Sequence, residues 1–155
     1  MNKLLLFFIS ISTLLSFVPT TNAAGLDAKV KQQIVEPVTA YFSALNTSDQ
    51  KTIMALYSKT PTFMQQGAPA FVGRTAVDRA YIEIFKLLNL NVSYDIEEVK
   101  MLSPTTALVR THSTGTAHFK PDKTSRNEGS NELFILNLEG EKWKIGHYIF
   151  SADHR

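Results

Sequence analysis

One carboxylate in the chain has unusual neighbours. Glu132 lies in the segment NELFILNL, in which most positions are apolar. Burying a carboxylate without a partner costs several kcal/mol, so Glu132 should have a partner nearby. The preceding segment offers Arg110 and His112 as partners, and a structural salt bridge inside a barrel is the favoured interpretation. The alternative is a catalytic group in which Glu132 and His112 form an acid–base pair and Arg110 orients Glu132.

The segment that supplies Arg110 and His112 has two faces, because alternate residues of a strand share a face. One face carries Arg110, His112, Thr114, Thr116 and His118, and the other carries Val109, Thr111, Ser113, Gly115 and Ala117. We expect the first, polar face to be the one that meets Glu132.

Two amides, Gln65 and Gln66, stand where an apolar run ends at the turn Gly67-Ala68-Pro69. An amide cannot titrate, but it can both donate and accept hydrogen bonds. We predict that both glutamines contact a polar group of a ligand. The alternative is that they only satisfy the backbone of the turn.

Further ligand contacts are expected from aromatic side chains and from one more amide. Most aromatic residues of a small domain belong to the core, but a phenol in a pocket wall adds one polar atom to an apolar surface. The remaining candidates for ligand binding are Tyr41, Tyr57, Phe85, Asn131 and Tyr148.

Several chemistries are not indicated. The chain has no cysteine and four histidines, and His112 and His118 are six residues apart in a strand, which is no metal-binding spacing. The glycine-containing segment GAPAFVG lacks the lysine of a phosphate-binding loop. We therefore expect neither a metal nor a cofactor. The formal net charge of +2 gives no basic face for nucleic acid, so no nucleic-acid partner is expected.

The first 23 residues read as a secretory signal peptide. Lys3 precedes an apolar run from Leu4 to Val18, and small residues before Ala24 favour cleavage after Ala23. The run is shorter than the ~20 residues that span a membrane, although an uncleaved anchor is the alternative. We predict a mature domain of residues 24–155 that is exported to a periplasm or out of the cell and is not held in a membrane.

The elements that must position the candidate residues follow from periodicity. Asp27 caps a helix that should kink at Pro37 or restart there with Pro37 in its first turn. A second helix follows Asp49, and a third begins near Arg74. An early strand covers 62–66, and a two-residue period from Asn91 onward predicts four long strands, among them 106–119, 128–138 and 142–151. Three helices followed by antiparallel strands indicate an α+β domain with the helices on one face of the sheet.

The last two strands, LFILNL and WKIGHYIF, are apolar at nearly every position. Such strands are covered on both faces. The helices supply one cover, and a second copy of the chain is expected to supply the other, which predicts a homodimer.

Three stretches carry a resemblance to a known group. PTFMQQGAPAFVGRTAVDRAY resembles the strand–turn–GR–helix signature of SnoaL-like and other NTF2-like proteins, NELFILNLEGEKWKIGHYIFS resembles their last hairpin, and AYFSALNTSDQKTIMALY fits their preceding helix pair. The resemblance covers about Asp27 to Ser151. It implies a cone-shaped α+β barrel with a pocket between the helices and a curved sheet.

The resemblance also bears on activity. Ketosteroid-isomerase-like members need a carboxylate base at the end of the first strand, where this chain has Gln65 and Gln66, so that proton shuttle is missing. The fold hosts isomerases, cyclases, dehydratases and binding modules. We expect an exported protein that binds a small, largely apolar molecule; the alternative is an isomerase, cyclase or dehydratase that uses Glu132 and His112, and an assembly module is a third.

Overall fold

The structure is a computed structural model that describes residues 26–153. The predicted signal peptide and His154 lie outside the described residues. The chain order is α1 (Ala28–Asn46), α2 (Gln50–Leu56), β1 (Tyr57–Met64), β2 (Phe71–Val72), α3 (Arg74–Leu87), β3 (Leu88–Ser103), β4 (Thr106–Phe119), β5 (Ser125–Glu139) and β6 (Lys142–Ala152).

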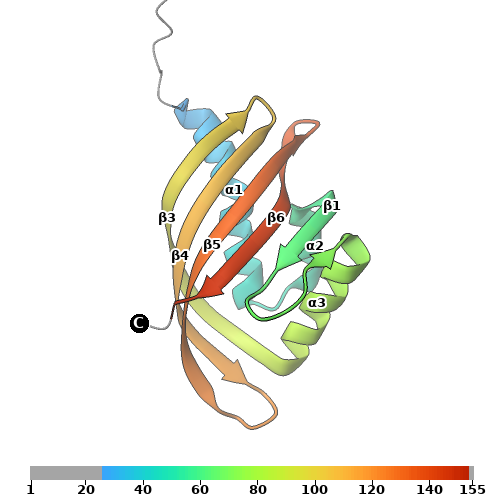
Figure 1. The fold of residues 1–155 in the computed structure, drawn as a ribbon. Coiled ribbons are helices and arrows are strands. Elements are labelled where there is room, and N and C mark those ends of the chain that lie inside the picture. The colour runs from blue at the N-terminus through green and yellow to red at the C-terminus, as the bar shows by residue number, and fades with distance from the viewer. Residues whose placement is uncertain (1–25, 154–155) are drawn as a thin grey trace, which may run out of the picture.

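The strands form one curved sheet in the order β2-β1-β6-β5-β4-β3, and the helices pack on one of its faces (Figure 1). All neighbouring strands are antiparallel except β1 and β6, which are parallel. The α+β class and the mostly antiparallel sheet are therefore confirmed. The edge strands β2 and β3 do not pair with each other, so the cone is an open one and not a closed barrel.

The helix starts agree with the capping residues. The Asp27 carboxylate accepts hydrogen bonds from the backbone N–H of Lys29 at 2.9 Å and of Val30 at 3.1 Å, and the Asp49 carboxylate accepts one from Thr52 N–H at 3.0 Å. Side chains that occupy the first orphan N–H groups stabilise a helix start.

Of the two outcomes expected at Pro37, a restart of the helix is wrong, because α1 is one helix from Ala28 to Asn46 with Pro37 inside it. An interior proline costs ~3 kcal/mol through its lost hydrogen bond. The face of α1 that includes Ile34, Val38 and Tyr41 is buried against the sheet, and this packing outweighs the local cost.

Strand bounds were predictable in part. β4 has the expected bounds, whereas β1 begins at Tyr57 and β5 at Ser125, earlier than their apolar patterns indicate. The polar start of β5 is held by its ladder with β4, in which Ser125 pairs with His118. The short strand β2 was not predicted; it pairs with the end of β1, where Phe71 lies opposite Phe63.

Two contacts fix the helices to the sheet around the interior. The Asn46 side chain donates to Val92 O at 2.8 Å and accepts from Val92 N–H at 2.9 Å, which ties the end of α1 to β3. The Arg74 guanidinium donates to the carbonyls of Met54, Tyr57 and Ser58 at 2.9, 3.3 and 3.0 Å, which ties the start of α3 to the α2–β1 junction.

Within residues 26–153, no helix is long and apolar enough to cross a membrane.

Candidate functional site

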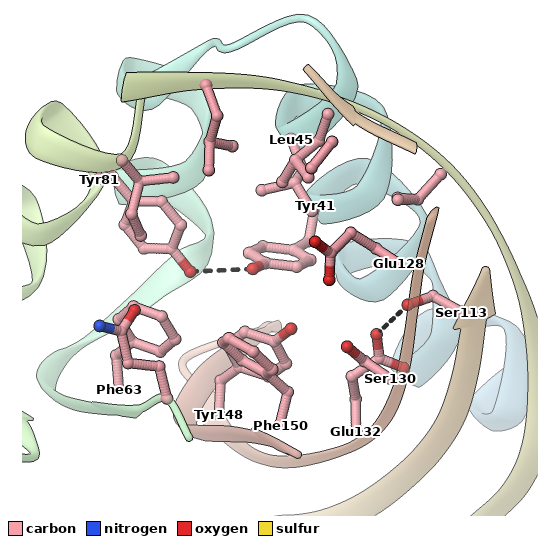
Figure 2. A pocket seen from close by; sticks show the side chains of 16 residues that line it. Tyr41, Leu45, Phe63, Tyr81, Ser113, Glu128, Ser130, Glu132, Tyr148 and Phe150 are labelled. Carbon is pink, nitrogen blue, oxygen red and sulfur yellow. Dashed lines mark hydrogen bonds between the residues drawn. The ribbon is translucent and has the colours of Figure 1, made fainter. Parts of the chain in front are cut away.

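A cavity of about 200 Å³ lies between α1, α3 and the inner face of the sheet. One wall is aromatic: the rings of Phe63 and Tyr148 are parallel within 6° at a centroid distance of 5.5 Å, and Phe150 lies 6.0 Å from Tyr148. Aliphatic residues such as Leu45 lie on the opposite side (Figure 2). The cavity is therefore mostly apolar, as expected of a small-molecule site.

Glu132 is the buried carboxyl in this cavity, with a residue exposure of 3%. The Thr111 hydroxyl donates to its Oε2 at 2.7 Å, and the Ser113 hydroxyl donates to its Oε1 (Figure 2). Burial raises the pKa of Glu132, and the two hydroxyl hydrogen bonds offset part of that rise. The protonated form of Glu132 therefore persists to higher pH than that of an exposed glutamate.

The register of β4 and β5 explains why these hydroxyls reach Glu132. Thr111 lies directly opposite Glu132 in the ladder, and Ser113 lies opposite Ser130. Residues that pair across two strands lie on the same face of the sheet. Glu132, Thr111 and Ser113 therefore all face the helices.

The predicted contacts of Arg110 and His112 with Glu132 are wrong. Arg110 lies on the outer face with a side chain 46% exposed, where it pairs with Glu97 and, at 3.5 Å, with Glu98. His112 Nε2 lies 3.2 Å from the carboxylate of Asp153, also on the outer face. We predicted that the face of β4 with Arg110 and His112 meets Glu132. The pairing register instead turns the other face, with Thr111 and Ser113, toward Glu132. We therefore assign neither Arg110 nor His112 to the cavity.

Four tyrosines form a connected group of phenols at the cavity. The Tyr81 hydroxyl lies 2.9 Å from the Tyr41 hydroxyl and 3.0 Å from that of Tyr57, and the Tyr148 ring lies 5.0 Å from the Tyr41 ring. Burial raises the pKa of all four phenols, because the phenolate is disfavoured away from water. These hydroxyls are therefore neutral and can donate hydrogen bonds.

Only some of the other residues predicted to contact a ligand line the cavity. Gln65, Tyr41 and Tyr148 line the cavity. Gln66 instead accepts a hydrogen bond from Ala152 N–H of β6, so it satisfies backbone of the last strand and not that of the turn named in the alternative prediction. Tyr57 contacts the cavity only through Tyr81.

Phe85 and Asn131 do not line the cavity. The Phe85 ring packs 6.0 Å from that of Tyr81, within the core, and Asn131 is exposed on the outer face. Asn131 pairs directly with His112 in the β4–β5 ladder, so both side chains lie on the outer face of the sheet.

Sequence reasoning missed several lining residues. Glu128 and Ser130 precede Glu132 at two-residue intervals on the inner face of β5, and Tyr81 and Phe150 complete the wall. Glu128 and Ser130 could have been predicted from the sequence, because alternate residues of a strand share the face of Glu132. Among the residues described, no group of three or more His, Asp or Glu side chains is arranged to hold a metal ion.

Comparisons with known proteins agree with the fold of the chain. The model of the SnoaL-like domain family matches residues 38–144. A ketosteroid isomerase-like protein from Erwinia carotovora atroseptica has a solved structure with a TM-score of 0.79, at 26% identity over 83% of this chain and 99% of that one. None of the curated proteins compared with the chain matches it.

Two more distant structures show the same fold. An NTF2-like superfamily protein from Salmonella enterica has a TM-score of 0.71 at 16% identity, covering 82% of this chain and 93% of that one. A type 2 hexachlorocyclohexane dehydrochlorinase has a TM-score of 0.73 at 8% identity, covering 81% of this chain and 86% of that one.

Proposed function

The chain belongs to the SnoaL-like domain family, and on that premise we propose that it binds a small, largely apolar molecule in the cavity beside Glu132. The observation that supports this most strongly is a carboxyl, 3% exposed, that lines a mostly apolar cavity. A buried carboxyl with a raised pKa that lines a mostly apolar cavity is the kind of group that marks a ligand site.

The cavity restricts what the ligand can be. Its volume of about 200 Å³ is below the range of about 300–1,000 Å³ that is usual for drug-sized ligands. The part of the ligand inside the cavity is therefore small. It packs against Phe63, Tyr148 and Phe150, and one polar group of it forms a hydrogen bond with Glu132.

The proposal is tested by filling the cavity. Val92 lines it from β3, whereas Ile96 is half-buried on the same face of β3 but does not line it. Molecules extracted from the purified wild type, Val92→Phe and Ile96→Phe are compared by mass spectrometry. We expect a molecule that accompanies the wild type and Ile96→Phe and is lost from Val92→Phe; equal retention by both variants would overturn the proposal.

A second candidate function is catalysis of proton transfer by Glu132. Its buried carboxyl with a raised pKa lies beside neutral phenols, and such a group can give or take a proton at a bound ligand. The predicted pairing with His112 is not part of this candidate. The chain lacks the strand-end carboxylate of ketosteroid isomerase, so that activity is not proposed.

Deuterium exchange separates catalysis from binding. The extracted molecule is incubated with protein in D₂O and its deuterium content is followed. A catalytic Glu132 predicts incorporation that Glu132→Gln slows by about 10²–10⁴-fold. The exposed Glu141→Gln is the control and should exchange at the wild-type rate. Exchange that is equal in all three proteins, or absent, leaves binding as the function.

We also propose that two copies associate through the outer face of the sheet. Here Leu133 pairs with Ile149, and Ile135 pairs with Leu108, which places four aliphatic side chains together. Ile149 is 39% exposed. A second copy would cover this outer-face patch.

Export remains a proposal that the first 23 residues support. Expression in a bacterium followed by N-terminal sequencing of the extracytoplasmic protein tests it. The expected first residue is Ala24; an intact Met1 in that fraction would contradict cleavage.

A further inference from the structure

We infer that the ligand is an elongated amphiphilic acid whose neutral end lies in the cavity and whose carboxylate lies outside it, beside Arg79. This inference rests on the proposed function and specifies the chemical class of the ligand.

The cavity continues into a surface groove. A groove of about 620 Å³ runs along α3 and the segment that follows β1. Gln65, Ile84 and Leu88 line both the groove and the cavity. A molecule longer than the cavity can therefore extend into the groove without leaving its apolar surroundings.

The groove floor is an apolar stripe of α3. Ala76, Ala80, Ile84 and Leu87 recur at intervals of three or four residues, so they lie on one face of the helix. Leu87 is 52% exposed, and Phe71 adds an aromatic ring from β2. This stripe continues the apolar lining of the cavity and suits the methylene chain of a ligand.

The charges at the two ends set the orientation of an acid. Glu128 and Glu132 lie together on one side of the cavity, and Phe63 and Tyr81, from the elements that border the groove, lie on the other (Figure 2). A ligand carboxylate placed beside these two carboxyl groups would require at least one of the three to hold a proton, which disfavours a ligand anion there. The carboxylate therefore belongs at the groove end.

Arg79 is the positive group of the groove. Its guanidinium makes no ion pair or hydrogen bond with any other residue in the range 26–153, whereas Glu83, the acidic residue of the groove, pairs with Lys86 at 2.7 Å. Arg79 precedes Ile84 by five residues, roughly 7.5 Å along the helix axis. A carboxylate that lies this far from the cavity opening can pair with Arg79.

Calorimetric titration of the full mature protein with defined probes tests the inference. The probes are decanoate, hexanoate, decylammonium, 10-hydroxydecanoate and decanedioate. Decanoate should bind more tightly than hexanoate, because only the longer chain covers the groove. Decylammonium should bind less tightly than decanoate, and decanedioate should bind at least about tenfold less tightly than 10-hydroxydecanoate, because its second carboxylate must approach Glu128 and Glu132.

Two variants locate the probe. Arg79→Gln should weaken the binding of decanoate by a factor of about 2–5, the usual contribution of an exposed ion pair. Arg126→Gln, outside the groove, should leave the affinity for decanoate unchanged. Leu87→Asp should weaken the binding of decanoate about tenfold. Leu102→Asp, at a similarly exposed leucine on β3, should leave the affinity for decanoate unchanged.

The outcomes distinguish the inference from the proposed function. Binding of decylammonium or decanedioate as tight as that of decanoate, or no effect of Arg79→Gln and Leu87→Asp, overturns the inference. So does a failure of decanoate to bind. In each case the extraction experiment with Val92→Phe decides independently whether the cavity holds a ligand.

Discussion

Thr111 lies directly opposite Glu132 in the β4–β5 ladder, and its hydroxyl donates a 2.7 Å hydrogen bond to the buried carboxyl. This pairing shows that Glu132 belongs to the inner face of the sheet and not to the charged outer face. Among residues 26–153, Glu132 is hydrogen-bonded by two hydroxyls and ion-paired with no cation, so it can change its protonation state when a ligand binds.

Removal of the Thr111 hydroxyl should destabilise the fold. Thr111→Val keeps the shape of the side chain but leaves one Glu132 oxygen without its donor, at an expected cost of about 1–3 kcal/mol. Urea unfolding measures this cost. The exposed Thr114→Val, on the outer face of the same strand, is the matched control and should stay within about 0.5 kcal/mol of wild type.

A double-mutant cycle identifies the cause. If the hydrogen bond to Glu132 is responsible, Thr111→Val should cost much less in a Glu132→Leu background. The same cost in both backgrounds would mean that Thr111 stabilises the strand in some other way.

The stability of the protein should depend on pH through Glu132. Burial raises the pKa of Glu132 in the folded chain above its unfolded value, near 4.5, so the folded state binds more protons in the interval between the two values. The contribution of Glu132 is therefore most favourable below that interval and is lost as pH rises through the folded pKa. Relative to Glu132→Gln, the wild type should lose stability as pH rises from about 4.5 toward neutrality.

Urea denaturation of both proteins across this pH range checks the sign. Glu141→Gln, at an exposed turn, should show no comparable difference from the wild type. A wild type that gains stability over Glu132→Gln as pH rises would show that the folded state prefers the ionised carboxylate.

Arg74 should be a stabilising residue although it lies outside the cavity. Its guanidinium donates to three backbone carbonyls at the α2–β1 junction, and Arg74→Ala leaves these acceptors without that donor. We expect a loss of about 2 kcal/mol in the free energy of unfolding. Arg79→Ala, in the same helix, should change it by less than about 0.5 kcal/mol, and equal effects of the two would contradict the role of Arg74.

The outer-face patch predicts the mass of the protein in solution. Sedimentation at micromolar concentration should give twice the mass of the mature chain, and Ile149→Lys should give a monomer, because a charge replaces apolar contact in the interface. Leu102→Lys, at a leucine outside that patch with 50% exposure, should remain dimeric. A monomeric wild type would contradict the dimer.

Local signals predicted the elements well and their pairing poorly. Asp27 and Asp49 marked the helix starts because capping depends on residues within one turn. The packing of α1 holds one helix through Pro37, where a restart was one of the expected outcomes, because burial of a helix face outweighs a local penalty. Pairing with the end of β4 across the hairpin also extends β5 over polar positions that no apolar pattern marks.

The site was predictable from composition but not from register. Glu132 stood out because it interrupts an apolar strand, and the structure does bring Gln65, Tyr41 and Tyr148 to the same cavity. Its partners were missed because the face that β4 turns inward depends on which residue lies opposite Glu132, and a shift of one residue exchanges the two faces. The contact between His112 and Asp153 joins the strand to the chain end, which no local pattern marks.

Carbon-13 NMR of the glutamate side-chain carboxyls tests the central claim most directly, that the Glu132 carboxyl faces a ligand cavity. The resonance that disappears in Glu132→Gln reports this group. We predict a titration midpoint above 4.5, which moves when the molecule extracted from the wild type is added. A midpoint at or below 4.5 that the molecule leaves unchanged would contradict the claim.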